Sequence, residues 1–214
     1  MTTSVLLVHG GLWDAMDAAA FWGTPGITAK LTAALDPDGS GQVELLAPDR
    51  PPRATGWDLE VGALGEHLAK RSGPVRIVGA SNGCTAAVLL ATRFPERVDR
   101  LLLAWPATGD DPAGNARAWA GMVNRGCPAD VADGLLEGGI LRGVPDVELA
   151  SLDRLRVAVL PSVPENPSHQ RKTVEKLLRS IRGSRELAGC PEPPTPGFPP
   201  FLDQLVRTIV EFVN

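Results

Sequence analysis

One serine stands between two glycines in the stretch Gly79, Ala80, Ser81, Asn82, Gly83. The apolar residues 75–79 before it predict a strand, and the alanine-rich residues 82–93 after it predict a helix. We therefore expect Ser81 on a tight turn whose strained backbone exposes the hydroxyl group, with small neighbours that let strand and helix pack closely. The N–H of Asn82, at the start of the helix, would point toward an oxyanion bound at Ser81.

A second turn of interest follows the predicted strand at 4–8. It reads His9, Gly10, Gly11, Leu12, Trp13. A glycine pair there exposes backbone N–H groups at the carboxyl edge of a parallel sheet, where α/β folds bind ligands. Trp13 and Trp105 both lie near predicted strand ends. They are candidates to line an apolar pocket, although buried tryptophan more often belongs to the core.

The elements that must position these turns alternate along the chain. Apolar runs at 43–47, 98–105 and 155–161 predict further strands, and 184–189 a weak one. Helical spacing occurs at 27–36, 57–71, 169–182 and 201–213. This alternation is typical of a mostly parallel sheet with helices on both faces. The residues at 106–152 are rich in Gly, Pro and Ala and predict a small helical lid, inserted in a single domain that spans 1–214.

Together the G-x-S-x-G turn, the His-Gly turn and the lid resemble the α/β-hydrolase superfamily. The resemblance implies that Ser81 is the nucleophile and that the amides of Gly11 and Asn82 form an oxyanion hole. It also implies that His9 supports the oxyanion loop through hydrogen bonds.

The catalytic acid is less well defined. The resemblance places it after the strand that follows the lid, where Glu165 lies. Asp110 and Asp111, after the strand at 98–105, are rival acids. All three residues also suit the first turn or the N-cap of a helix, where acidic side chains are favoured.

The base is missing from its expected place. The resemblance implies a histidine between the last strand and the last helix, but residues 189–200 read GCPEPPTPGFPP. His67 is expected on a helix surface. His169 opens the helix after the Glu165 loop and is the candidate base, or simply a polar residue at a helix start. Without a base, Pro191, Glu192 or a neighbour would fill the space opposite Ser81, and ester hydrolysis would be very slow.

The charge and composition of the chain argue against several classes of binding partner. The formal net charge is −4 and the pI about 5.4, with charges of both signs interspersed, so neither nucleic acid nor an anionic membrane is an expected partner. No phosphate loop, dinucleotide fingerprint, metal cluster or other cofactor motif occurs, and the three cysteines suggest no disulfide framework. A cytoplasmic protein that acts on a small molecule is expected, and the residue usage suits a bacterial genome.

Three functions remain open at this stage. The first is an enzyme of hydrolase ancestry with atypical or non-hydrolytic chemistry on a small carbonyl compound, such as an ester, thioester, lactone or polyketide-like molecule. The second is a conventional serine esterase or thioesterase with its histidine relocated to His169. The third is a small-molecule-binding protein that has lost catalysis. In every case we expect Gly79→Val and Gly83→Val to impair folding.

Overall fold

A computed structural model describes residues 2–214. Its centre is a six-stranded sheet in the order β2-β1-β3-β4-β5-β6, and every neighbouring pair is parallel. The strands are β1 Thr3–Val8, β2 Val43–Leu46, β3 Val75–Ala80, β4 Val98–Ala104, β5 Arg156–Leu160 and β6 Arg185–Glu186. The carboxyl ends of parallel strands meet at one edge, so the loops after β1, β3, β4, β5 and β6 open toward the same region.

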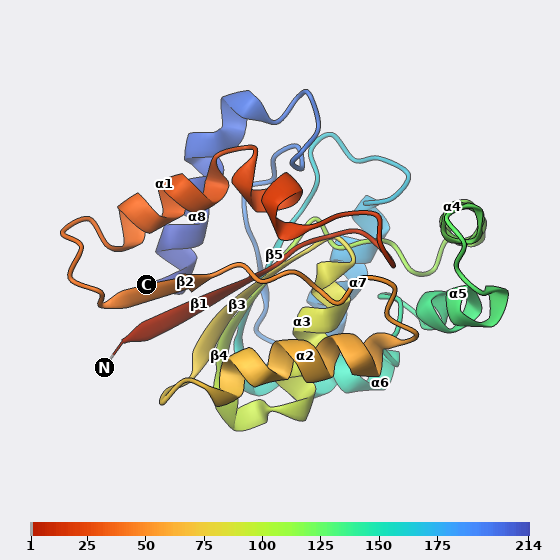
Figure 1. Ribbon diagram of the computed structural model, residues 1–214, viewed down its shortest axis with the longest axis horizontal. Coiled ribbons are helices and arrows are strands. Elements are labelled where there is room, and N and C mark those ends of the chain that lie inside the picture. The colour runs from red at the N-terminus through yellow and green to blue at the C-terminus, as the bar shows by residue number, and fades with distance from the viewer. Residues whose placement is uncertain (1) are drawn as a thin grey trace.

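Helices cover both faces of this sheet (Figure 1). On one face lie α1 (Ile27–Leu35) and α8 (Leu202–Val213), which pack on each other. On the other lie α2 (Trp57–Ala69), α3 (Gly83–Arg93) and α7 (Arg171–Ser180). A π-helical turn, η1 (Ala19–Gly23), precedes α1, and short 3-10 turns occupy η2 (Pro95–Arg97) and η4 (Pro199–Phe201).

An apolar core lies on each face of the sheet, between the sheet and its helices, and successive side chains of a strand enter the two cores alternately. In β1, Leu6 and Val8 join the core shared with α2 and α3, while Val5 and Leu7 join the core shared with α1 and α8. Successive side chains of a strand point to opposite faces, and a sheet covered on both faces therefore reads as a continuous apolar run.

The segment between β4 and β5 is helical, and its first two helices project from one end of the molecule (Figure 1). It contains α4 (Pro112–Asn124), α5 (Ala129–Leu136), α6 (Asp146–Leu149) and the 3-10 turn η3 (Ala150–Arg154). Asp111 begins α4 as an N-cap, because its carboxylate accepts a hydrogen bond from the Gly114 N–H, and Pro112 occupies the first helical position.

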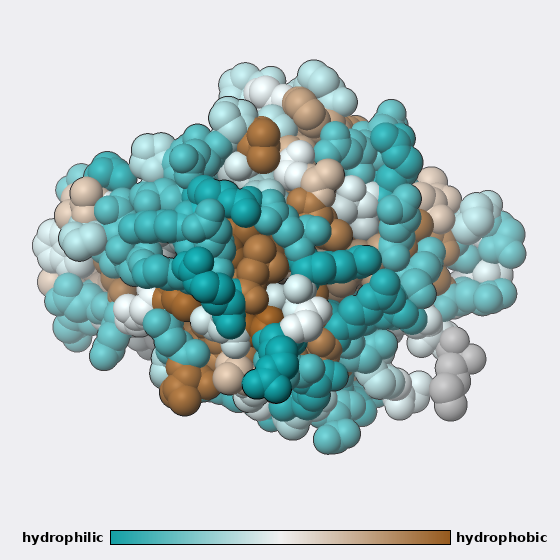
Figure 2. Space-filling model, turned by 180° about the vertical axis from the view of Figure 1, so that it is seen from behind, coloured by the Kyte–Doolittle hydropathy of each residue, from teal (hydrophilic) through white to brown (hydrophobic). Residues whose placement is uncertain are grey.

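These observations confirm the predicted fold class. The predicted strands and helices occur within a few residues of their expected bounds; the weak strand at 184–189 contracts to the two residues of β6. The face opposite to that of Figure 1 is mostly hydrophilic, with hydrophobic residues in a strip across its centre (Figure 2). Over residues 2–214, no helix combines the length and apolarity that a bilayer crossing requires.

Candidate active site

Ser81 lies in the turn between β3 and α3 with φ of 52°, a left-handed backbone that non-glycine residues rarely adopt. Its N–H donates to the Ala104 carbonyl at 2.9 Å, which ties the turn to the end of β4. A Cβ at Gly79 would lie 2.7 Å from the Ala87 Cβ, and one at Gly83 would lie 2.5 Å from the His9 carbonyl oxygen. Close packing of strand, turn and helix therefore accounts for both glycines.

The turn after β1 packs directly against Ser81. A Cβ at Gly10 would lie 2.9 Å from the Ser81 Cβ, so only glycine brings this backbone so near. Gly11 has φ of 84°, again a conformation suited to glycine. The N–H groups of Gly11 and Asn82 donate to no protein acceptor in the described part of the chain, and both residues line the same cavity.

His9 does not line that cavity but holds its wall in place. The ring is buried, its Nε2 accepts from the Arg50 N–H at 3.0 Å, and its Nδ1 lies 2.8 Å from the Gly10 carbonyl oxygen. The Nδ1–H tautomer satisfies both contacts. Burial, with a smaller effect from Arg50, lowers the pKa of His9, which favours this neutral form.

Arg50 is the centre of that support. Its Nη1 donates to the carbonyls of His9, Gly10 and Gly11 at 3.0, 3.1 and 2.9 Å. Its charge is balanced by Glu60, with Nη2 and Oε2 at 2.7 Å and both side chains almost fully buried. With its carbonyls turned toward Arg50, the loop leaves its N–H groups for the opposite side.

His169 brings an imidazole to the serine. Its Nε2 lies 2.9 Å from the Ser81 Oγ, and the residue is 8% exposed, in the loop between β5 and α7. The loop at 189–200, where the resemblance implies the histidine, supplies no imidazole; the ring at Ser81 belongs to His169, the candidate that the sequence offered in its place. The Thr108 N–H donates to the Ser168 carbonyl at 2.8 Å, and the Thr108 Oγ1 accepts from the Gln170 N–H at 3.0 Å. Both bonds fix the turn that carries the ring.

Glu192 lies behind the imidazole. Its Oε2 contacts the Nδ1 of His169, and its Oε1 accepts from the Asn166 side chain at 3.3 Å. Asn166 also accepts from the N–H groups of Ser168 and His169 through its Oδ1, at 2.9 and 3.2 Å. One amide side chain thus links the acidic residue to the turn that carries the imidazole.

The order of these residues along the chain differs from the usual one. In α/β-hydrolases the acid precedes the histidine, whereas here His169 follows β5 and Glu192 follows β6. The two loops run side by side: Ser162 and Cys190 pair as a parallel bridge, and the Val163 N–H donates to the Cys190 carbonyl at 3.2 Å. This pairing brings Glu192 and His169 into contact beside Ser81 despite their order along the chain.

Trp105 supports the loop that carries Glu192 and does not line the cavity. It is fully buried, and its Nε1 donates to the Cys190 carbonyl at 2.9 Å, two residues before Glu192. Trp13 likewise does not line the cavity; it lies beside the Arg53 guanidinium, 5.2 Å from the ring centroid. The expectation that these two rings form a pocket wall is not met, because one is core and the other faces a rim arginine.

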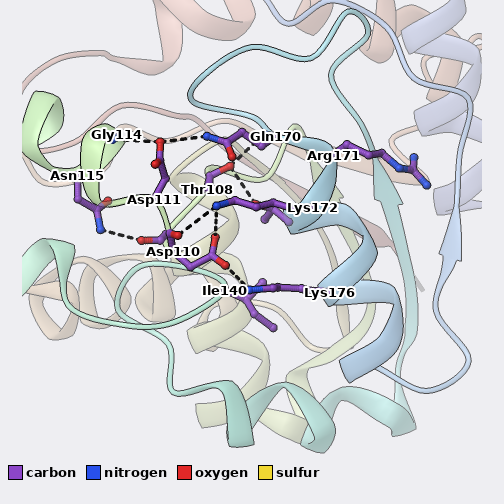
Figure 3. A network of polar contacts seen from close by, with 12 residues as sticks. Thr108, Asp110, Asp111, Gly114, Asn115, Ile140, Gln170, Arg171, Lys172 and Lys176 are labelled. Atoms are coloured by element: carbon purple, nitrogen blue, oxygen red, sulfur yellow. Dashed lines mark hydrogen bonds and ion pairs between the residues drawn. The ribbon is translucent and has the colours of Figure 1, made fainter.

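The three acids expected from the sequence lie elsewhere. Glu165 accepts from the Arg171 N–H at 2.7 Å, so it binds the N-terminal turn of α7 and not the His169 ring. Asp110 pairs with Lys172 and Lys176, and Asp111 caps α4 while accepting from Gln170 at 3.0 Å. Figure 3 shows the contacts of Asp110 and Asp111 as a network that joins the start of α4 to α7. The geometry therefore favours the alternative given for Glu165 and Asp111, that each acid serves at the start of a helix.

The cavity at Ser81 has a volume of about 340 Å³. Residues from the turns after β1, β3 and β5 form one side of it, and α4 forms much of the other. Its lining residues are Gly11, Leu12, Ala15, Ser81, Asn82, Gly114, Arg117, Ala118, Gly121, Met122, Arg125, Arg142, Ser168 and His169. A small organic molecule fits such a space. In residues 2–214, no cluster of three or more His, Cys, Asp and Glu side chains could hold a metal ion.

The sequence alone did not indicate the contacts of Glu192, Asn166 and Arg50. It placed Glu192 opposite the serine, as a residue that fills the space or as a weak proton acceptor, and not behind an imidazole. One signal was available: Glu192 is the single acidic residue of 189–200, the loop in which the resemblance implies a catalytic side chain. No local pattern marks the others, because each acts through contacts far along the chain.

No protein-family model matches the sequence, and no curated protein matches it significantly. Solved structures do. A meta-cleavage product hydrolase from Pseudomonas fluorescens IP01 gives a TM-score of 0.69 at 17% identity over 98% of this chain and 90% of that one. A serine hydrolase from Cycloclasticus zankles gives 0.70 at 14%, over 99% and 89%. An alpha/beta hydrolase from Sphaerobacter thermophilus gives 0.60 at 18%, over 100% and 93%. The likeness extends over nearly the whole of each chain, and the protein has the α/β-hydrolase fold.

Proposed function

We propose that the protein is a serine hydrolase that cleaves an ester or thioester of a small molecule through an acyl-enzyme at Ser81. The observation that carries this proposal is the 2.9 Å contact between the Ser81 Oγ and the His169 Nε2, with Glu192 against the opposite ring nitrogen. A nucleophile, a base and an acid that orients the base are the three parts that nucleophilic acyl transfer needs.

In the acylation step, the Ser81 Oγ attacks the substrate carbonyl carbon while its proton passes to the His169 Nε2. The Glu192 carboxylate, in contact with Nδ1, favours the tautomer that carries its proton there and leaves Nε2 free, and it stabilises the imidazolium that forms. The carbonyl oxygen becomes an oxyanion, and the N–H groups of Gly11 and Asn82 are the donors for it. The tetrahedral intermediate then collapses, and the leaving group departs with the proton from Nε2.

Deacylation repeats these roles with water. His169 takes a proton from the water, whose oxygen attacks the acyl carbon, and the C–O bond to Ser81 breaks. The proton returns to the serine oxygen and the free acid leaves. The segment 106–152, whose α4 forms one wall of the cavity, serves as the lid that encloses the substrate and limits water.

A fluorophosphonate probe tests this proposal, because it reacts only with an activated serine. We expect labelling of the wild-type protein and none of Ser81→Ala. His169→Ala should lose labelling and lower kcat/KM for phenyl butyrate by about ten thousand-fold, as removal of a triad member does elsewhere. His67→Ala is the matched control, since that histidine lies on α2, away from the cavity.

Absence of labelling in the folded wild-type protein would overturn the proposal. It would favour instead the non-hydrolytic or binding roles that the sequence left open.

A further inference from the structure

The cavity at Ser81 has a pronounced charge asymmetry. Three of its lining residues are arginines, and none is Asp or Glu. Two of the three are partly neutralised outside the cavity: Arg125 binds Asp14 at 3.0 Å, and Arg117 lies 3.9 Å from Asp111. Arg142 is the exception, and it is the most buried of the three.

Arg142 is 5% exposed and has no carboxylate within ion-pair distance in the described structure. Its Nη1 donates to the Asn82 Oδ1 at 2.8 Å and its Nε to the Asn115 Oδ1 at 3.0 Å, both neutral acceptors. Its Nη2 donates to no acceptor within residues 2–214 and is not sealed from the cavity that the residue lines. Donors of a buried cation are thus available to a molecule bound beside Ser81.

The guanidinium is held in this position by its own loop. The Thr85 Oγ1 donates to the Arg142 carbonyl at 2.7 Å, which fixes the loop to α3. Gly143 is pressed against Trp57, where a Cβ would lie 2.2 Å from the indole Nε1. Burial lowers the pKa of Arg142 to about 10 although the charge of Asp111 opposes it, so the group remains charged at neutral pH. A buried charge without an ion-pair partner is costly, and an anionic ligand would reduce that cost.

We propose that Arg142 binds a carboxylate of the substrate, which makes the substrate an acyl compound with a second, ionised carboxyl group. The inference rests on the proposed hydrolysis at Ser81 and adds a substrate class to it. Guanidinium and carboxylate match as two parallel, charge-assisted hydrogen bonds, which gives orientation as well as affinity.

The same contacts limit the distance between the two ends of the substrate. Arg142 touches the side chain of Asn82, whose own N–H is an oxyanion donor in the proposed mechanism. The carboxylate and the reacting carbonyl therefore lie on either side of one residue. A short dicarboxylic half-ester suits this spacing and the cavity of about 340 Å³.

The first test compares monophenyl glutarate with phenyl methyl glutarate, which differ only in the charged carboxyl group, by phenol release after subtraction of the spontaneous rate. We expect the wild-type kcat/KM to favour the charged ester at least about tenfold. Arg142→Met should abolish this preference, so that the variant's kcat/KM values for the two esters agree within about threefold. Arg207→Met, on the exposed side of α8, should retain the preference. Equal rates for both esters in the wild type would overturn the proposal.

The second test does not depend on catalysis. In Ser81→Ala, monomethyl glutarate should raise the melting temperature and dimethyl glutarate should not, while adding Arg142→Met should remove the shift. Inorganic phosphate at the same concentration should give a smaller shift, and an equal one would overturn the assignment of a carboxylate. If monomethyl but not dimethyl glutarate raises the melting temperature, and the wild-type serine is not labelled by the fluorophosphonate probe, the anion site stands and the proposed hydrolysis is rejected. If Arg142→Met does not fold, the comparison of the two glutarate esters in Ser81→Ala still decides.

Discussion

The two halves of the site are built by different means. The half that holds Ser81 is made of backbone: a turn at φ of 52° and a glycine that approaches a neighbouring carbonyl more closely than any Cβ allows. The half that holds His169 and Glu192 is made of side-chain hydrogen bonds between two adjacent loops. Steric exclusion defines the first half, so a methyl group should break it. Polar pairing defines the second, so an isosteric change should break it while the fold survives.

The largest expected effect is on the backbone half. A Cβ at Gly83 would lie 2.5 Å from the carbonyl oxygens of both Val8 and His9, which are backbone atoms that cannot swing aside. Gly83→Val should therefore yield little soluble folded protein, a loss beyond about 4 kcal/mol. The control is Gly134→Val on α5, where a Cβ would meet nothing within 4 Å. Circular dichroism and urea unfolding would measure both, and equal stability of the two variants would contradict the steric account.

Substitutions in the polar half should lower the catalytic activity while the protein stays folded. Glu192→Gln keeps the shape of the side chain but removes the charge that stabilises an imidazolium, so kcat/KM should fall about a thousandfold or more. Glu165→Gln changes the acid that the sequence favoured, and it should leave kcat/KM within about threefold because Glu165 contacts α7. The melting temperature of each variant checks that the fold persists. A larger loss in Glu165→Gln than in Glu192→Gln would reverse the assignment.

The same contrast explains what the sequence could predict. Local spacing along the chain predicts three features: the turn around Ser81, the His-Gly turn, and the alternation of strands and helices. Each depends on residues that are close together in the sequence. His169 could be named as a candidate because its loop opens at the right edge of the sheet. Glu192 could not be paired with it, because that contact requires the register of β5 and β6 and the loop connections at Cys190.

The buried ion pair of Arg50 and Glu60 supports the backbone half of the site. Arg50→Met leaves Glu60 buried without a partner and frees three loop carbonyls, which should cost about 3 kcal/mol in the free energy of unfolding at pH 7. Burial already raises the pKa of Glu60 although Arg50 opposes it, and the variant should raise it further.

A raised carboxyl pKa in the folded state means that the stability deficit grows as pH rises through that pKa and shrinks toward about pH 5. Urea unfolding at both pH values measures this. Arg50→Met with Glu60→Leu, which leaves no buried charge, should recover much of the loss. A deficit in Arg50→Met that does not change with pH would mean that the carbonyl contacts, and not the unpaired carboxylate, dominate.

The smallest expected effect lies in the network between α4 and α7. Burial raises the pKa of Asp110, but hydrogen bonds and charge from Lys176 and Lys172 outweigh it and leave the pKa below its ordinary value. A lowered carboxyl pKa stabilises the fold above the unfolded pKa of about 4, and this stabilisation is lost as pH falls through the folded pKa. Asp110→Asn should therefore cost about 1 kcal/mol at pH 7 and progressively less as pH falls below about 4. Catalysis should change little, because Thr108 and not Asp110 holds the turn of His169. Urea unfolding at pH 7 and pH 3, with the exposed Asp133→Asn as control, measures the difference; a loss that is the same at both pH values would show that the ion pairs contribute nothing.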